Sequence, residues 1–144
     1  MTNYLDTLND EIKEYFSILC PEFPEWMIDY INTPELQRIH TISMSCGTDY
    51  TKIFNNTYWY SNLDHSIGVA LIIWNFTHDK KQTLSGLFHD IATPTFKHCI
   101  DFMNGDSEHQ ESTEERTEQI IRDSKEIMTL LNRDNIKVEE VSDY

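Results

Sequence analysis

The chain has little positive charge, few turn-forming residues and no long apolar run. Its 144 residues include only 11 Lys and Arg against 25 Asp and Glu, which gives a net charge of −14. Binding to a polyanion needs clustered basic side chains, so nucleic acid polymers and membrane surfaces are not expected as partners. The longest apolar run, residues 69–74, is far too short to span a bilayer. A small anionic substrate is still compatible with this charge if a cation meets it.

Cysteine, glycine and proline are also scarce. The three cysteines, Cys20, Cys46 and Cys99, form no CxxC pair, so a zinc ribbon or a thioredoxin-like motif is not supported. Their odd number and wide spacing are typical of reduced thiols, and the N-terminus lacks the pattern of a signal peptide, so a cytoplasmic location is expected. The low numbers of Gly and Pro, 4 of each, argue against a collagen-like chain and a loop-rich β-protein. The 7 Phe, 7 Tyr and 3 Trp indicate a packed core.

Apolar residues recur at helical spacing, and no alternating run of strand length appears. The pattern therefore predicts an all-α fold with one domain over residues 1–144. Helices are expected over residues 6–19, 26–31, 34 to about 42, 62–77, 82–91, 94–104 and 108–131. The polar residues 46–61 are expected to form a loop, and a connection of this length is usually functional or mobile.

His65 lies near the start of the helix expected over residues 62–77. It shares one helix face with Gly68, Val69, Ile72 and Phe76, and we expect this face to be buried. A buried imidazole needs a hydrogen bond or a metal ion. His65 is therefore either a core histidine bonded to a carbonyl or a metal ligand.

His89 and Asp90 follow an apolar stretch, residues 84–88. Burying a carboxylate without a partner is costly, and a divalent cation could supply that partner. Neighbouring helix residues point about 100° apart, so both side chains could approach one ion only near a helix end, which Pro94 predicts here. Gly86, one turn before Asp90, would let another helix come close. The alternative is an exposed Asp90 beside a core histidine.

The other histidines and the nearby basic residues are less specific. His98 and His109 are each also consistent with a surface or capping role, and His40 and His78 are expected to be structural. The basic residues that could meet an anion, all of which are also typical of a solvated surface, are Arg38, Lys52, Lys97 and Arg116.

Four short stretches follow one another along the chain. They are Leu63-Asp64-His65-Ser66-Ile67-Gly68-Val69, Leu87-Phe88-His89-Asp90-Ile91, Pro94-Thr95-Phe96-Lys97-His98 and His109-Gln110-Glu111. Together with Gln37-Arg38-Ile39 and Ile42 upstream, this series resembles the HD-domain metal-dependent phosphohydrolases. The greatest similarity is to the branch that includes deoxynucleoside triphosphate triphosphohydrolases. The resemblance covers about residues 36–112.

The resemblance implies an HD-domain helical bundle around one or two divalent metal ions. His65, His89 and Asp90 match three of the family's metal ligands, while His98 and His109 match polar positions that line the site. His109 also matches a proposed catalytic histidine. We therefore expect catalytic roles for His109, His98 and Asp90, and substrate binding by Arg38, Lys52 and Lys97. A site of nitrogen and oxygen ligands suits Mn, Fe, Ni, Co, Zn or Mg.

The chain departs from the family pattern at three places. Thr93 and Asn62 stand where the triphosphohydrolases have a histidine and an arginine on the substrate side. The family's fourth ligand is an aspartate on a later helix, whereas the last candidate here, Asp143, has no such helix around it. We therefore expect a domain shortened at its C-terminal end, in which residues 106–144 form a long helix and a short tail without a fourth ligand.

These observations predict a metal-dependent phosphohydrolase acting on a nucleotide or another small phosphate ester. The metal ion would bind a phosphate oxygen and lower the pKa of a bound water toward about 7. His109 could then protonate the leaving oxygen. Two alternatives stay open: a catalytically impaired HD-fold sensor that binds a metal or nucleotide, and a helical interaction module with the acidic residues 106–126 as its partner surface. A homo-oligomer is compatible with each.

Overall fold

The computed structural model describes residues 3–45, 52–53, 59–95 and 111–142, without the side chains of residues 111–115. Within these ranges the regular secondary structure is helical, apart from one isolated antiparallel bridge between Ser43 and Ser61. The predicted all-α fold is therefore confirmed. None of the helices described is both long enough and apolar enough to cross a membrane.

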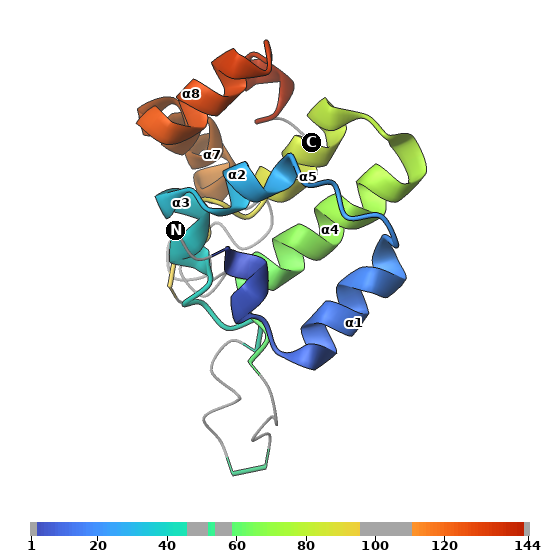
Figure 1. The fold of residues 1–144 in the computed structure, drawn as a ribbon. Helices are drawn as coiled ribbons and strands as arrows, with labels where there is room; N and C mark the ends of the chain where they lie inside the picture. The colour runs from blue at the N-terminus through green and yellow to red at the C-terminus, as the bar shows by residue number, and fades with distance from the viewer. Residues whose placement is uncertain (1–2, 46–51, 54–58, 96–110, 143–144) are drawn as a thin grey trace.

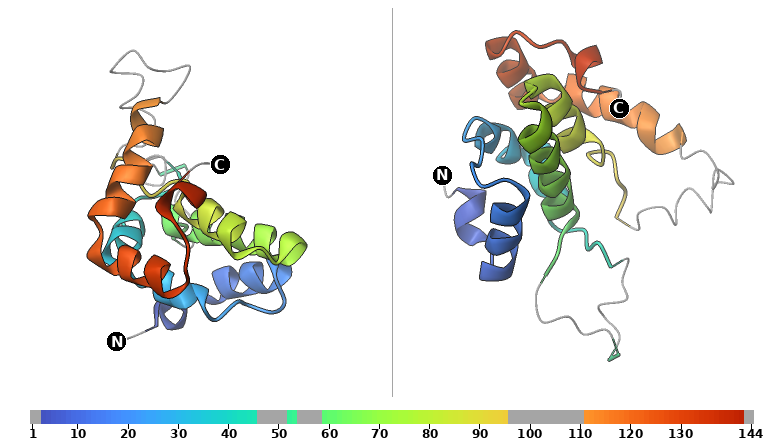
Figure 2. Two further views of the ribbon diagram at one scale, coloured as in Figure 1. Left: turned by 90° about the horizontal axis from the view of Figure 1, so that it is seen from above. Right: turned by 90° about the vertical axis from the view of Figure 1, so that its right-hand side faces the viewer.

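The helices follow one another in the order shown in Figure 1. They are η1 (Tyr4–Thr7), α1 (Asp10–Leu19), α2 (Met27–Ile31), α3 (Pro34–Ile39), α4 (Asn62–Thr77), α5 (Lys80–Phe88), α7 (Glu111–Asp123), α8 (Lys125–Arg133) and η3 (Val138–Glu140). α4 and α5 form a tightly packed helical hairpin, α1 and α3 contact α4, and α8 contacts α2. In the right-hand view of Figure 2 this hairpin lies between α1 on one side and α7 on the other.

The start and end of α4 are set by local chemistry. Ser61 Oγ accepts a hydrogen bond from the Asp64 backbone N–H, and the Asp64 side chain accepts one from the Ser61 backbone N–H. This capping box satisfies two donors that a helix start otherwise leaves unpaired. At the other end His78 adopts a left-handed conformation, with φ of 52°, and its N–H donates to the Trp74 carbonyl at 2.9 Å. The helix expected over residues 62–77 is confirmed.

A glycine allows α4 and α5 to approach closely. A Cβ atom added at Gly86 would lie 2.4 Å from Ile73 Cδ1 and 3.3 Å from Val69 Cγ1, both on α4. Any larger residue would therefore need these side chains to move. The close approach expected at Gly86 is confirmed, and it brings the end of α5 next to the start of α4.

The core is formed by side chains from all parts of the described chain. Its largest fully buried members are Tyr30, Phe88, Met27, Ile31, Leu36, Ile39, Leu63, Ile67, Leu71, Leu84, Leu87 and Ile91. Burial of a Val, Leu, Ile, Phe or Met side chain contributes about 1.5–3 kcal/mol relative to exposure. Most members of this set belong to α4, α5 and the helices before them, so the hairpin is the centre of the packing.

The C-terminal helices are held to the rest by apolar and ionic contacts. The apolar residues after α8 are buried, namely Ile136, Val138 and Val141. Asp134 accepts a hydrogen bond from Tyr30 Oη at 2.7 Å and pairs with Lys80 Nζ at 2.8 Å. One carboxylate therefore joins the end of α8 to both α2 and α5.

Two predicted helices are each divided in the structure. The helix expected over residues 6–19 becomes η1 and α1, because Asn9 caps α1 through a hydrogen bond from the Ile12 N–H to its side chain at 2.9 Å. The helix expected over residues 108–131 is described from Glu111 onward and is interrupted at Ser124. Ser124 has an extended ψ of 110° and accepts from the Ile127 N–H at 3.1 Å, so it ends α7 and caps α8.

Two other boundaries differ by a few residues. α3 ends at Ile39, three residues before Ile42, and α5 begins at Lys80 because the Asp79 side chain accepts from the Gln82 N–H. α5 ends at Phe88, so His89 and Asp90 lie just beyond it. The helix expected over residues 94–104 falls mainly on residues 96–110, which lie outside the described residues.

Candidate metal centre

His65, His89 and Asp90 lie close enough together to bind one cation. Nε2 of His65 is 3.8 Å from Oδ2 of Asp90, and Nε2 of His89 is 3.4 Å from the same oxygen. One ligand atom from each residue lies within 4.8 Å of the other two. Two ligand atoms that each lie about 2.1 Å from a zinc ion in tetrahedral geometry are about 3.4 Å apart. The three predicted ligands therefore come together at separations that fit one shared ion.

The helical hairpin explains why residues distant in sequence meet. His65 is the fourth residue of α4, and His89 is the C-cap residue of α5, with Asp90 next to it. Because the two helices run in opposite directions, the start of α4 meets the end of α5. The helix end at Phe88 lets the neighbouring side chains of His89 and Asp90 turn to the same place, as the sequence predicts.

The ring of His89 is fixed by the backbone. Its Nδ1 lies 2.7 Å from the carbonyl oxygen of Gly86, which can only accept a hydrogen bond. Nδ1 of the neutral ring therefore carries the proton, and Nε2 carries the lone pair beside Asp90. The rings of His65 and His89 meet edge to face, with centroids 5.2 Å apart. A carbonyl partner on the other ring nitrogen is the usual support of a metal-binding histidine.

Arg38 holds the turn that follows Asp90. Its Nη2 donates to the carbonyl oxygens of Ile91 at 2.7 Å and Thr93 at 3.0 Å. Burial lowers the pKa of this guanidinium. The contact spans more than fifty residues of sequence, and the sequence analysis did not predict it. Substrate binding by Arg38 stays a prediction, and the structure adds a role in positioning the Asp90 turn.

The remaining predicted site residues are not brought to the three ligands by the described structure. Lys52 and Arg116 are exposed. Those that lie outside the described residues are Lys97, His98, His109 and Asp143. Among the residues described, no other His, Cys, Asp or Glu belongs to the His65, His89 and Asp90 group.

A buried polar network supports the residue before His65. Asp64 is 1% exposed and accepts from Tyr4 Oη at 2.7 Å and from Ser61 Oγ at 2.8 Å. The Tyr4 hydroxyl donates its one hydrogen bond to Asp64. Nδ1 of His40, which lies 2.9 Å from Tyr4 Oη, is therefore the donor in that contact. Burial and the nearby Asp64 charge both raise the pKa of Tyr4. The sequence analysis missed this network, although an Asp three residues after Ser61 is the spacing of a capping box.

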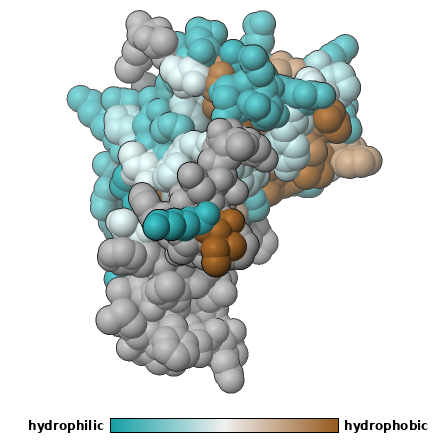
Figure 3. All heavy atoms as spheres, turned by 90° about the horizontal axis from the view of Figure 1, so that it is seen from below, coloured by the Kyte–Doolittle hydropathy of each residue, from teal (hydrophilic) through white to brown (hydrophobic). Residues whose placement is uncertain are grey.

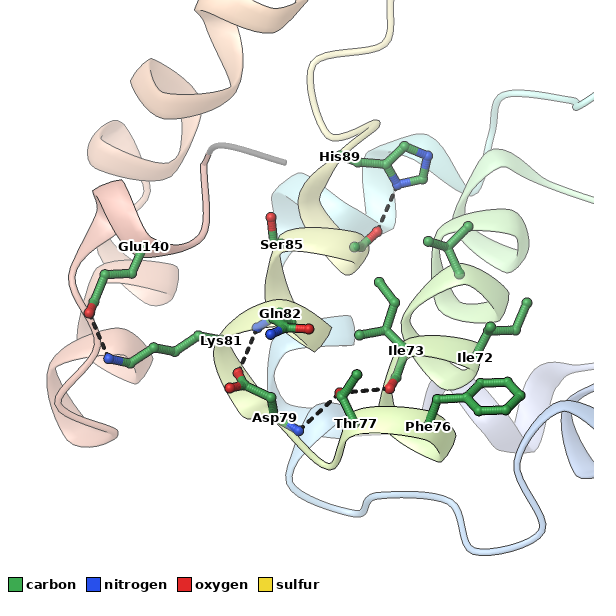
Figure 4. Close-up of a pocket in the computed structure, with 12 residues that line it drawn as sticks. Ile72, Ile73, Phe76, Thr77, Asp79, Lys81, Gln82, Ser85, His89 and Glu140 are labelled. Atoms are coloured by element: carbon green, nitrogen blue, oxygen red, sulfur yellow. Dashed lines mark hydrogen bonds and ion pairs between the residues drawn. The ribbon is translucent and has the colours of Figure 1, made fainter.

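The sequence predicts that the α4 face shared by Ile72 and Phe76 is buried, but the structure shows both residues exposed. Ile72 is 41% exposed and Phe76 is 81% exposed. A groove of about 830 Å³ lies between α4 and α5 beside this face, and Ile72 and Phe76 are among its lining residues. Figure 4 shows His89 at one end of the groove and Phe76 near the other. The groove therefore begins beside the candidate metal centre.

This arrangement offers two imidazole nitrogens and one carboxylate oxygen to a cation at the open end of a helical hairpin. Three protein ligands leave coordination positions for water and a substrate, which is the pattern of catalytic rather than structural metal sites. No protein-family model, curated protein or solved structure matches this chain.

Proposed function

We propose that this chain is a metal-dependent phosphohydrolase with an HD-domain bundle, acting on a nucleotide or another small phosphate ester. The observation that carries the proposal is the convergence of His65, His89 and Asp90 within 4.8 Å of one another. The order of the sequence motifs adds to it, since these three residues match metal ligands of the family that the chain resembles. The metal ion would be Mn, Fe, Ni, Co, Zn or Mg, because the ligands are nitrogen and oxygen atoms.

The residues of the chain have distinct tasks in this proposal. Asp90 supplies the negative charge that attracts a divalent cation, and the hydrogen bond to Gly86 O presents the Nε2 lone pair of His89. Arg38 keeps Asp90 in place through the turn that follows it. A bound divalent ion would polarise a phosphate oxygen and provide a hydroxide nucleophile near neutral pH. It would also offset the net charge of −14, which otherwise repels phosphate.

Proton transfer and further substrate contacts are assigned by resemblance. His109 is proposed to protonate the leaving oxygen, and His98 is proposed to act in catalysis with it. Lys52 and Lys97 are proposed to contact the substrate, as basic side chains that could reach a phosphate. The variants His109→Gln and His98→Gln should keep metal binding and lower turnover, which separates these roles from metal ligation.

The proposal is tested by elemental analysis of the purified protein, followed by assays on phosphate monoesters and nucleotides. Asp90→Ala should reduce bound metal from about one ion per chain to nearly none and abolish hydrolysis. Helix content should stay nearly the same, because Asp90 lies outside α5. The matched control is Asp123→Asn, which changes an exposed acid of α7 and should retain metal and activity. Full metal content and full activity in Asp90→Ala would refute the metal assignment.

A specific observation favours a second candidate, a sensor that binds a metal or nucleotide without turnover. Asn62 is fully buried and Thr93 is 1% exposed, although both stand at positions that face the substrate in the triphosphohydrolases. Neither side chain is presented to a ligand in the way that those positions require. Metal bound at His65, His89 and Asp90 without hydrolysis of any tested phosphate ester would favour the sensor.

A further inference from the structure

The groove beside His89 is formed by matching faces of two helices. On α4 the lining residues Val69, Ile72, Ile73 and Phe76 are apolar and recur at helical spacing, and the polar Thr77 lines the end of the helix. On α5 the opposite wall includes Ser85 and Gly86, and Ile73 of α4 packs directly against Gly86. Figure 4 shows Ile73 between the two helices, whereas Ile72 and Phe76 point away from α5. A continuous apolar wall therefore leads away from the candidate metal centre.

The charged residues of the groove are already engaged. Lys81 Nζ lies 2.6 Å from Glu140 Oε1, and the Asp79 carboxylate accepts a hydrogen bond from the Gln82 N–H at 2.9 Å. Among the described lining residues, Lys81 is the only Lys or Arg. A chain of phosphates lying along this groove would meet two carboxylates and no unpaired cation. An uncharged apolar group is the better fit.

The length of the groove limits the size of this group. Helices rise about 1.5 Å per residue, so the seven steps from Gln82 to His89 span about 10 Å. This length suits an aryl group or a medium-length alkyl chain. Seen from below, the molecule carries hydrophobic side chains along one edge of its surface (Figure 3).

We propose that the substrate is a phosphate monoester of an apolar alcohol or phenol. Its phosphate lies at His65, His89 and Asp90, and its apolar group lies in the groove between α4 and α5. This inference rests on the proposed phosphohydrolase function and specifies its substrate class. In the reaction, a water oxygen forms a bond to phosphorus while the phosphorus–oxygen bond to the alcohol breaks. The leaving oxygen takes up a proton, and the products are the free alcohol and orthophosphate.

The experiment uses n-alkylphosphonates, which keep the phosphate-like head but resist hydrolysis. Calorimetric titration of the metal-loaded protein with methyl-, butyl- and hexylphosphonate should show affinity rising about two- to fourfold for each added methylene, as expected for burial of apolar surface. Metal-free protein should lose affinity for all three. This readout is binding alone and needs no turnover.

Matched variants assign the chain-length effect to the groove. Ile72→Ser and Phe76→Ser change exposed residues, so the fold should be retained while the gain per methylene falls to less than twofold. Affinity for methylphosphonate should not change in either variant. The control is Ile18→Ser, which changes an exposed residue of α1 that does not line the groove, and it should behave as the unmodified protein.

Each other outcome has a distinct meaning. Binding of methylphosphonate without any gain from a longer chain overturns the groove proposal and leaves the phosphohydrolase proposal standing. Equal binding of hexylphosphonate with and without metal also overturns it, because the groove would then act apart from the metal centre. A dimer in sedimentation that Ile72→Ser dissociates would show that a second copy covers the groove. Failure of the protein to bind metal at all would instead refute the proposed function.

Discussion

Nδ1 of His89 and the carbonyl oxygen of Gly86 lie 2.7 Å apart, which fixes the tautomer of the imidazole. The hydrogen bond closes within the last turn of α5 and needs no other part of the chain. It leaves Nε2 facing Oδ2 of Asp90 at 3.4 Å. The end of one helix thus presents two ligand atoms in a defined orientation, and α4 adds the third through His65.

Metal removal should leave the fold intact. The ligand side chains of His65 and Asp90 are 32% and 19% exposed, and the fully buried core residues are supplied by other positions. Brief treatment with a chelator should therefore strip the ion while the far-ultraviolet circular dichroism spectrum stays unchanged. The melting temperature should fall modestly, because binding at 100 times Kd contributes about 2.7 kcal/mol. Loss of helix content on chelation would contradict this and indicate a structural metal.

Replacing Arg38 should weaken metal binding without touching a ligand. Arg38→Met removes two hydrogen bonds from a charged donor to the turn after Asp90, and we expect a loss of about 1–3 kcal/mol in the free energy of unfolding. Metal affinity should fall about tenfold, as is typical for groups that orient metal ligands. Urea unfolding and metal titration measure the two effects, with Arg116→Met as the exposed control. A change in KM alone would mean that Arg38 acts on the substrate.

Replacing the two glycines of the helical hairpin with alanine should have different effects on stability. In Gly86→Ala the new Cβ meets Ile73 Cδ1 at 2.4 Å, whereas in Gly68→Ala its nearest neighbours are at 3.4 Å. Alanine gains about 0.5–1 kcal/mol over glycine within a helix, and overpacking costs about 1–3 kcal/mol. Gly68→Ala should therefore be neutral or stabilising, and Gly86→Ala should be less stable than it by about 1–2 kcal/mol in thermal unfolding. Equal stability of the two variants would contradict this packing argument.

Asp134 should make the stability of the protein depend on pH in the acid range. Burial alone would raise its pKa, but hydrogen bonds from Arg133, Lys80 and Tyr30 outweigh it and hold the pKa well below the usual value. A carboxyl group whose pKa is lower in the folded state contributes fully to the free energy of unfolding when the pH is above its unfolded-state pKa of about 3.9. This contribution is lost as the pH falls toward the folded-state pKa. Asp134→Asn should cost about 1–3 kcal/mol at pH 7.

The same variant should lose less stability than the unmodified protein when urea unfolding is repeated below about pH 4, because it has no carboxylate to protonate. Asp123→Asn, which changes an exposed acid, serves as the control. A constant difference between Asp134→Asn and the unmodified protein from neutral pH down to the acid limit would show that Asp134 does not act through its charge.

The parts of the fold that local sequence determines were predicted well. The span of α4, a helix end close to His89 and Asp90, and the close approach at Gly86 each depend on a few neighbouring residues. The sequence indicated all three, although it placed the helix end at Ile91 and the structure places it at Phe88. The division at Ser124 was not predicted, because serine also occurs inside helices and only the packing of α7 and α8 decides its role here.

Contacts between distant segments were harder to predict. Arg38 meets Ile91 and Thr93 across the fold, and nothing in the neighbouring sequence of Arg38 indicates its partners. The exposure of Phe76 has a related cause. Helical periodicity shows which residues share a face, but it does not show whether another element covers that face.

The placement of the three ligands on one hairpin has a consequence for the order of folding. His65 and Asp90 are separated by 25 positions, whereas the Tyr4 contact with Asp64 spans 60. Closing the longer segment costs only about 0.8 kcal/mol more in chain entropy, but local contacts generally form faster. The ligand cluster can therefore assemble from 26 consecutive residues before the N-terminal segment docks. A cation present during folding would then favour the hairpin as a nucleus, on which the helices before and after it assemble.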